Sequence, residues 1–181
     1  EDSLDVVLIG ASQLYTGYSA PLAWQQYGYT SYPLTVSNIP ARLYGSLLTE
    51  AVNRQHPKLI VVDIDGFIND ENPETLEANL RKWIDNIPWS RNRLETIRTC
   101  VPRELQTSFY FNIAKYHANW YQVGKWVPVQ RRLHIMDETG CSLTKGVETV
   151  CKSLSADYVP DVRPLTLSAA NEQYLRAFCA Q

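Results

Sequence analysis

The hydrophobic positions near the start of the chain include two short continuous runs. Residues 5–10 read Asp-Val-Val-Leu-Ile-Gly, and residues 59–64 read Leu-Ile-Val-Val-Asp-Ile. Apolar runs of this length, bounded by turn residues, are typical of strands that are buried on both faces of a parallel sheet. Between them, residues 41–55 follow a proline and carry apolar side chains at helical spacing, namely Leu43, Leu47, Leu48, Ala51 and Val52. Residues 5–64 therefore predict the order strand, loop, helix, strand, which is a βαβ unit with parallel strands.

Helical patterns dominate the next part of the chain. Capping side chains and prolines predict three helices, which begin at Asn72, Ser90 and Pro102 and extend to about residues 86, 97 and 116. Residues 122–165 show no periodic pattern, and a loop of this length is usually functional or packs as a flap. Ser168 caps a last predicted helix, with Leu175 and Phe178 facing inward.

Length and composition favour one domain. The chain has 181 residues, of which 45% are apolar, enough for one sizeable core but not for two ordinary domains. We assign residues 1–181 to a single α/β domain, with a βαβ core at 5–64, a helical and loop insertion at 72–165 and a last helix at 168–179. Doubly wound sheets usually have about five strands or more. Because only two are predicted, we expect the domain to be incomplete at its C-terminus.

Charge and cysteine content narrow the classes of function. Seventeen basic and nineteen acidic residues give a net charge of −2 without any basic run, so we expect no nucleic-acid partner. No apolar run approaches the roughly 18 residues of a membrane span. The chain opens without Met or an apolar leader, so we expect any targeting segment to have been removed or never to have existed. The four cysteines form no C-x-x-C pair, and either a Cys141–Cys151 disulfide or four free thiols is compatible with their spacing.

Ser12 is the first candidate for chemistry. It lies two residues beyond the first predicted strand, after Gly10. Ligands of open α/β sheets bind outside the carboxyl ends of the strands. A serine here is placed to offer its hydroxyl as a nucleophile and its backbone N–H to an oxyanion. The alternative is a serine that only caps a helix or closes a turn.

Several segments, taken in order, resemble the SGNH (GDSL-type) hydrolases. The branch they resemble is the bacterial cell-surface one, which works beside membrane acyltransferases on envelope polymers. The segments are Asp5-Val-Val-Leu-Ile-Gly-Ala-Ser12-Gln, Pro21-Leu-Ala-Trp24-Gln-Gln-Tyr-Gly28, Pro57-Lys-Leu-Ile-Val-Val-Asp63, Ile84-Asp-Asn-Ile-Pro-Trp-Ser90-Arg-Asn-Arg93 and Tyr116-His117-Ala-Asn-Trp120.

The resemblance implies a three-layer, flavodoxin-like parallel sheet and gives roles to individual residues. Ser12 matches the nucleophile. Asn38 stands where the family has an oxyanion-hole glycine, and Asp65 stands near the position of an oxyanion-hole asparagine, for which Asn69 is a substitute only if its loop folds back. A carboxylate at Asp65 would repel a developing oxyanion. The family's base lies in an Asp-x-x-His motif, which residues 1–181 do not contain.

Other polar and aromatic groups are weaker candidates. His117 matches a segment at the mouth of the cleft in the resembled branch, or else it packs at a helix end. The acidic residues between 63 and 71 suggest a cation site, but strand-end and helix-capping roles explain them, so we expect no metal and no cofactor. Aromatic side chains in loops either join the core or form a platform for sugar rings; these are Trp24, Tyr27, Tyr29, Tyr32, Trp120, Tyr121 and Trp126.

The expected function is therefore that of a serine esterase or O-acyltransferase. Its substrate would be an acylated envelope or extracellular glycan, outside the cytoplasm of a bacterium, with a membrane acyltransferase as a partner. The alternative is a catalytically inactive relative that keeps the cleft for binding.

Overall fold

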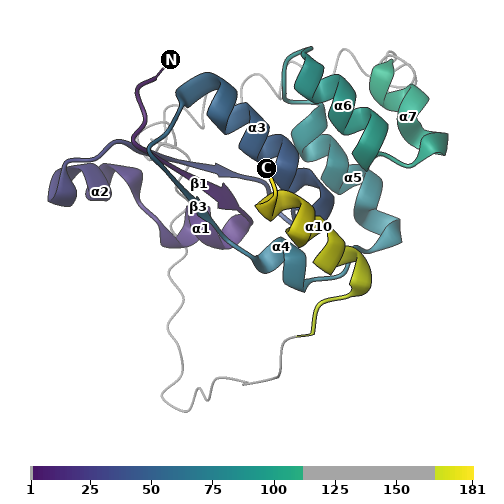
Figure 1. The fold of residues 1–181 in the computed structure, drawn as a ribbon, viewed down its shortest axis with the longest axis horizontal. Helices are drawn as coiled ribbons and strands as arrows, with labels where there is room; N and C mark the ends of the chain where they lie inside the picture. The colour runs from purple at the N-terminus through teal and green to yellow at the C-terminus, as the bar shows by residue number, and fades with distance from the viewer. Residues whose placement is uncertain (1, 112–165) are drawn as a thin grey trace, which may run out of the picture.

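Three parallel strands form the sheet of the computed structural model, which describes residues 2–111 and 166–181 (Figure 1). They are β1 (Val6–Gly10), β2 (Ser31–Thr35) and β3 (Leu59–Val62), in the spatial order β2-β1-β3. In β1, Val7 stands opposite Tyr32 on one side and opposite Ile60 on the other. The prediction that the first and last of these segments are parallel neighbours is confirmed.

The sequence prediction of a loop between β1 and the helix at residues 41–55 is wrong. This connection is not a loop, because it contains α1 (Ser12–Gly17), α2 (Ala20–Tyr27) and β2. Pro33 hides this strand, since proline normally argues against a central strand. β2 forms one edge of the described sheet, where a residue without an N–H is tolerated.

The remaining helices agree closely with the predicted ones, except for a short helix directly after β3 that was not predicted. A short 3-10 turn, η1 (Ala41–Leu43), leads into α3 (Tyr44–Gln55), and β3 is followed by α4 (Asp65–Ile68). The predicted helices beginning near Asn72, Ser90, Pro102 and Ser168 are α5 (Pro73–Ile84), α6 (Arg91–Cys100), α7 (Arg103–Tyr110) and α10 (Ala169–Cys179). The side chains of Asn72, Ser90 and Ser168 accept hydrogen bonds from the first turns of their helices, as predicted. The part of the third predicted helix beyond residue 111 and the predicted irregular stretch 122–165 lie outside the described residues.

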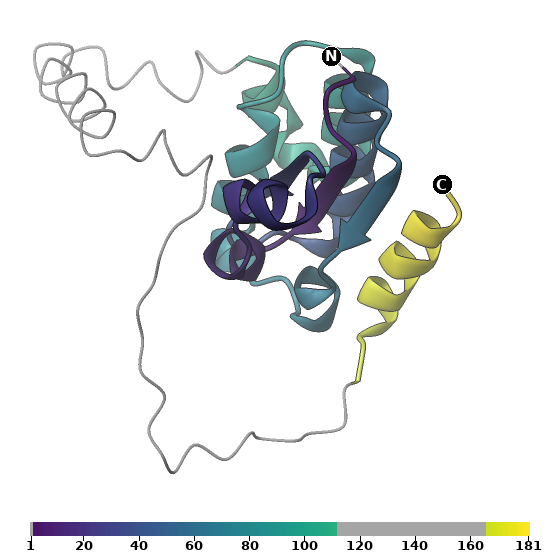
Figure 2. The ribbon, with the colours of Figure 1, turned by 90° about the vertical axis from the view of Figure 1, so that its left-hand side faces the viewer.

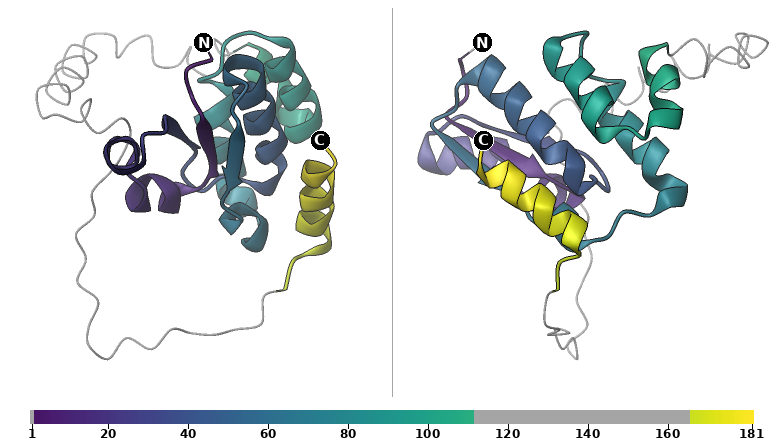
Figure 3. Two further views of the ribbon diagram at one scale, coloured as in Figure 1. Left: turned by 60° about the vertical axis from the view of Figure 1, so that its left-hand side comes forward. Right: turned by 45° about the vertical axis from the view of Figure 1, so that its right-hand side comes forward.

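Helices lie on both sides of the sheet. Figure 3 shows α1 and α2 on one side and α3 on the other, with α10 farther out on the α3 side. Val7 and Ile9 of β1 point into the main core with Leu47 of α3, and all three are almost fully buried. The structure is therefore a mixed α/β fold built on a small parallel sheet.

β3 differs from the prediction of a strand buried on both faces. Leu59 is 55% exposed and Val61 is 39% exposed. Both alternate with Ile60 and Val62, which pack against the core. The physical reason is that α1 and α2 lie over β1 and β2, and no other helix in the described part of the chain packs on the outer face of β3.

α10 packs against the rest of the fold through aromatic rings, although it is far away in sequence. Phe178 lies 6.0 Å from Phe67 of α4 and 6.2 Å from Tyr44 of α3, measured between ring centroids. Figure 2 shows α10, in yellow, as a separate helix at one side of the molecule. Leu175 and Phe178 face inward as predicted, and both are half-buried. In the described ranges, no helix is both long and apolar enough to cross a bilayer.

Candidate functional site

The carboxyl ends of the three strands meet at one edge of the sheet. Val36, just beyond β2, donates its N–H to the Gly10 carbonyl at 3.0 Å. Asp63, just beyond β3, donates its N–H to the Ile9 carbonyl at 2.8 Å. The loops that carry Ser12, Asn38 and Asp65 therefore leave the sheet side by side, which is where open α/β folds bind their ligands.

Asp63 holds two of these loops together. Its Oδ2 accepts a hydrogen bond from the Ala11 N–H at 3.1 Å, and its Oδ1 accepts one from the Asp65 N–H at 3.0 Å. The carboxylate thus positions the residue before Ser12 and the first residue of α4. In the sequence, Asp63 stands out only as one of several acidic residues between 63 and 71, and this role was not predicted. The available signal is a carboxylate directly after a buried strand.

Ser12 begins α1 and remains accessible. Its side chain is half-buried, and its Oγ lies 3.5 Å from Oε1 of the neighbouring Gln13. The described residues include one histidine, His56, which precedes β3 and lies 2.7 Å from Asp2. That contact is at the amino edge of the sheet, so His56 is on the wrong side to accept a proton from Ser12. His117, the other predicted site histidine, lies outside the described residues.

A pocket of about 270 Å³ brings together the other predicted site residues. Asn38 from the loop after β2 lines it together with Asp65, the first residue of α4, and Asn69, which caps the end of α4. Ser12 is not part of the lining. The remaining lining residues come from the loop between β2 and η1, from α4 and from the chain through α5, and they are Ile39, Pro40, Gly66, Asp70, Glu71, Asn72, Thr75, Leu76 and Asn79.

Asn38 adopts the backbone conformation that glycine favours. Its φ is +54°, in the left-handed region, where asparagine is tolerated better than most residues. The resemblance expects a glycine at this position, and the structure shows that the backbone geometry suits one.

Asn69 is turned toward Asp65. Its Nδ2 donates to the Asp65 carboxylate at 3.1 Å and to the Asp65 carbonyl at the same distance. These bonds join residues four apart in the chain, because Asn69 caps the end of the short helix α4 that begins at Asp65. The amide hydrogens therefore serve Asp65 instead of standing free for an oxyanion. The negative charge at this wall of the pocket works against a developing oxyanion.

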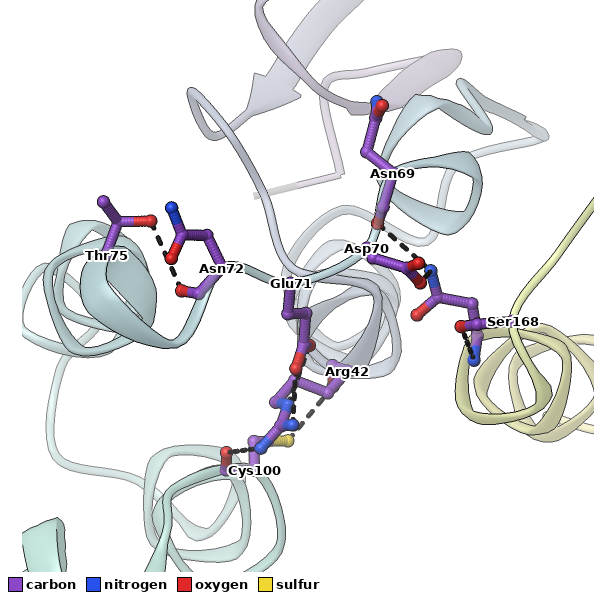
Figure 4. A network of polar contacts seen from close by, with 9 residues as sticks. Arg42, Asn69, Asp70, Glu71, Asn72, Thr75, Cys100 and Ser168 are labelled. Carbon is purple, nitrogen blue, oxygen red and sulfur yellow. Dashed lines mark hydrogen bonds and ion pairs between the residues drawn. The ribbon is translucent and has the colours of Figure 1, made fainter.

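The rim behind the pocket is held by a salt bridge (Figure 4). Arg42 of η1 donates Nε and Nη2 to the Glu71 carboxylate at 2.8 and 2.5 Å, and Nη1 to the Cys100 carbonyl at 2.9 Å. Burial raises the pKa of the Cys100 thiol, which makes it a poor nucleophile. Cys100 and Cys179 are both free, whereas Cys141 and Cys151 lie outside the described residues.

The acidic residues after β3 have structural partners. Asp63 binds two backbone N–H groups, Glu71 binds Arg42, and Asp70 lies 3.5 Å from the Asn171 amide. Within the ranges that the structure describes, no three His, Cys, Asp or Glu side chains are grouped so that they could hold a metal ion.

The aromatic side chains near the N-terminus lie partly at the surface. Trp24 and Tyr27 of α2 are exposed, and the Tyr27 ring stacks on Tyr29 with centroids 6.2 Å apart. They are not part of the pocket described above. The aromatic residues Trp120, Tyr121 and Trp126 lie outside the described residues.

Comparison with known proteins adds no relative, because no family model, no curated protein and no solved structure matches this chain.

Proposed function

We propose that the protein is a serine esterase or O-acyltransferase of the SGNH type. Its substrate would be an acylated envelope or extracellular glycan of a bacterium, with a membrane acyltransferase as a partner outside the cytoplasm. The observation that carries the proposal is the accessible Ser12 hydroxyl at the carboxyl edge of a parallel sheet, beside a loop that holds Asn38 in a left-handed conformation.

The chemistry is acyl transfer through a covalent intermediate. Ser12 Oγ attacks the acyl carbonyl while a base takes the hydroxyl proton. The tetrahedral intermediate then breaks its bond to the sugar oxygen, which takes up that proton and leaves as an alcohol. Water, or a hydroxyl of a second sugar, next attacks the acyl-enzyme and restores the Ser12 hydroxyl. The base is assigned by resemblance to an Asp-x-x-His motif, which residues 1–181 do not contain.

Two backbone N–H groups are the proposed donors to the oxyanion. The N–H of Ser12 lies in the first turn of α1, where backbone N–H groups have no acceptor within the helix. The N–H of Asn38 lies in the neighbouring loop. Asp63 supports this arrangement, because it fixes the N–H of Ala11 and thereby the turn that presents Ser12.

The test is covalent labelling of the full-length protein with a fluorophosphonate probe. We expect labelling at Ser12, located by mass spectrometry of the tryptic peptides, and loss of labelling in Ser12→Ala. Ser37→Ala is the matched control, because Ser37 lies at the same edge of the sheet in the loop after β2 and should leave labelling unchanged. An unlabelled, folded full-length protein would overturn the proposal.

A second candidate is a binding domain that has lost catalysis. The Asp65 carboxylate in the pocket wall favours it, because a fixed negative charge opposes an oxyanion. The same labelling experiment separates the two candidates. Labelling at Ser12 excludes the inactive domain, and its absence together with retained glycan binding supports it.

A further inference from the structure

The pocket beside Asn38 has two walls of polar but mostly uncharged groups. One wall is a face of α5 and its cap, where Asn72, Thr75 and Asn79 follow one another at helical spacing. The opposite wall carries Asn38 and Asn69 from two different loops. Figure 4 shows Asn72 and Thr75 on one side and Asn69 on the other. Side-chain amides and a hydroxyl from several elements therefore line the same pocket.

Three of these side chains, Asn38, Asn69 and Asn72, retain hydrogen-bonding capacity. Thr75 donates to the Asn72 carbonyl and accepts from Asn79, both at 3.4 Å, and Asn79 also accepts from Lys82. The Asn38 side chain makes no hydrogen bond to any other residue that the structure describes, and it is exposed. Asn72 uses its Oδ1 to accept from the Glu74 N–H at 2.9 Å, which leaves its NH₂ available. Asn69 uses its NH₂ on Asp65, which leaves its side-chain Oδ1 available. The pocket thus offers both donors and acceptors, and sugar hydroxyls both donate and accept.

The charges around the pocket disfavour anions. Asp65 and Asp70 contribute carboxylates to the lining, whereas the Glu71 carboxylate is neutralised by Arg42. Lys82 lies at the edge of the pocket, where its Nζ donates to the Ser37 carbonyl at 3.1 Å and to Asn79 Oδ1 at 2.8 Å. Both acceptors are uncharged, so Lys82 keeps its positive charge. The two carboxylates of Asp65 and Asp70 still outnumber this single ammonium group, so a ligand with a carboxylate or phosphate would meet a net negative charge.

We propose that this pocket binds one uncharged sugar residue of a glycan and discriminates against uronic acids and phosphorylated sugars. The volume of about 270 Å³ lies just below the ~300 Å³ at which typical ligand pockets begin, so it suits a single ring. The inference rests on the proposed function for the choice of a glycan, and it narrows that glycan to one that is neutral at this position.

The test uses the full-length protein carrying Ser12→Ala, so that binding is measured without turnover. Triacetylchitotriose and cellotriose serve as uncharged probes and trigalacturonate as the anionic one, with binding followed by calorimetry and by NMR of side-chain amide resonances. We expect at least one uncharged probe to bind and to shift the amide resonances of Asn38 and Asn79. We expect trigalacturonate to bind at least about tenfold more weakly.

Variants assign the binding to this pocket. Asn38→Gly keeps the left-handed backbone and removes the amide, and Thr75→Val keeps the shape and removes the hydroxyl. Each should weaken binding about 3- to 10-fold, as expected for the loss of one neutral hydrogen bond. Thr99→Val, the matched control on an exposed position of α6, should leave affinity unchanged. Asp65→Asn should narrow the gap between the neutral probes and trigalacturonate.

The outcomes separate this inference from the esterase proposal. Labelling of Ser12 in the native protein, combined with no binding of either neutral probe, overturns the sugar pocket alone. Binding of trigalacturonate that is as tight as that of the neutral probes, or tighter, also overturns it. So does binding of the neutral probes that Asn38→Gly and Thr75→Val leave unchanged. Sugar binding by a protein that the probe fails to label supports the pocket and overturns the esterase.

Discussion

Gly10 shows how one residue shapes the site. A Cβ atom at this position would lie 2.4 Å from Cβ of Asp63 and 2.9 Å from Cδ1 of Leu14. Because the end of β1 must pass this close to Asp63, the carboxylate can reach the Ala11 N–H and hold the turn that carries Ser12. The glycine is needed here for close approach, and not for a left-handed backbone.

Replacing this glycine should therefore be costly. We expect Gly10→Ala to lower the free energy of unfolding by about 1–3 kcal/mol, since the added methyl group overpacks the contact with Asp63. Urea denaturation followed by circular dichroism measures it. Gly17→Ala is the control, because no atom lies within 4 Å of the added methyl group and the change should be neutral or slightly stabilising. Equal effects of the two substitutions would contradict the explanation.

At the scale of elements, α10 is joined to the site by a buried amide. Asn171 is 2% exposed, and its Nδ2 donates to the Asn69 carbonyl at 3.1 Å. About two turns further along the same face of α10, Phe178 packs against Tyr44 and Phe67. This helix therefore supports the chain segment that forms one wall of the pocket.

Removing that amide should loosen α10 before it unfolds the rest. We expect Asn171→Ala to cost about 1–3 kcal/mol, because the Asn69 carbonyl loses its buried donor. Hydrogen exchange should show faster exchange in α10 and in residues 69–71 than in β1. Gln173→Ala, on the exposed face of the same helix, should leave exchange unchanged. Uniform acceleration throughout the molecule would argue against a local role.

At the scale of the whole molecule, two aspartates join the strands at opposite edges of the sheet. Asp63 acts at the carboxyl edge, and Asp5 acts at the amino edge. The Asp5 carboxylate accepts from Lys58 Nζ at 2.7 Å and from the Thr30 N–H and hydroxyl at 2.9 and 2.8 Å. The hydrogen bond from Lys58, followed by those from Thr30, holds the Asp5 pKa well below its ordinary value of 3.8.

This depressed pKa predicts the direction of acid sensitivity. The ionised Asp5 stabilises the fold above pH 3.8, and that contribution is lost as the pH falls below this value toward the lowered pKa. We expect Asp5→Asn to be less stable than the native protein at neutral pH, and to lose less stability on going to pH 3. Urea midpoints at pH 7 and pH 3 measure both effects. Lys58→Met should change the acid sensitivity in the same direction, and an unchanged pH dependence in Asp5→Asn would contradict the assignment.

The local elements could be predicted from the sequence because contiguous residues encode them. The apolar runs of β1 and β3, the caps Asn72, Ser90 and Ser168, and the inward face of α10 depend on neighbours a few positions away. Among the candidate site residues, Ser12 followed from its place beyond a buried strand, whereas Asn38, Asp65 and Asn69 were given by the resemblance. The role of Ser12 as a nucleophile remains a proposal.

Contacts between distant segments were decided only by the tertiary structure. β2 could not be predicted because Pro33 is acceptable only in a strand that lies at an edge, and an edge is a property of the whole sheet. The partners of Asp63 and Asn69, and the exposure of Leu59, likewise depend on which segments pack together. Periodicity in the sequence reports which side of an element is apolar, but not which neighbour covers it, so the shape and charge of the pocket emerged only from the fold.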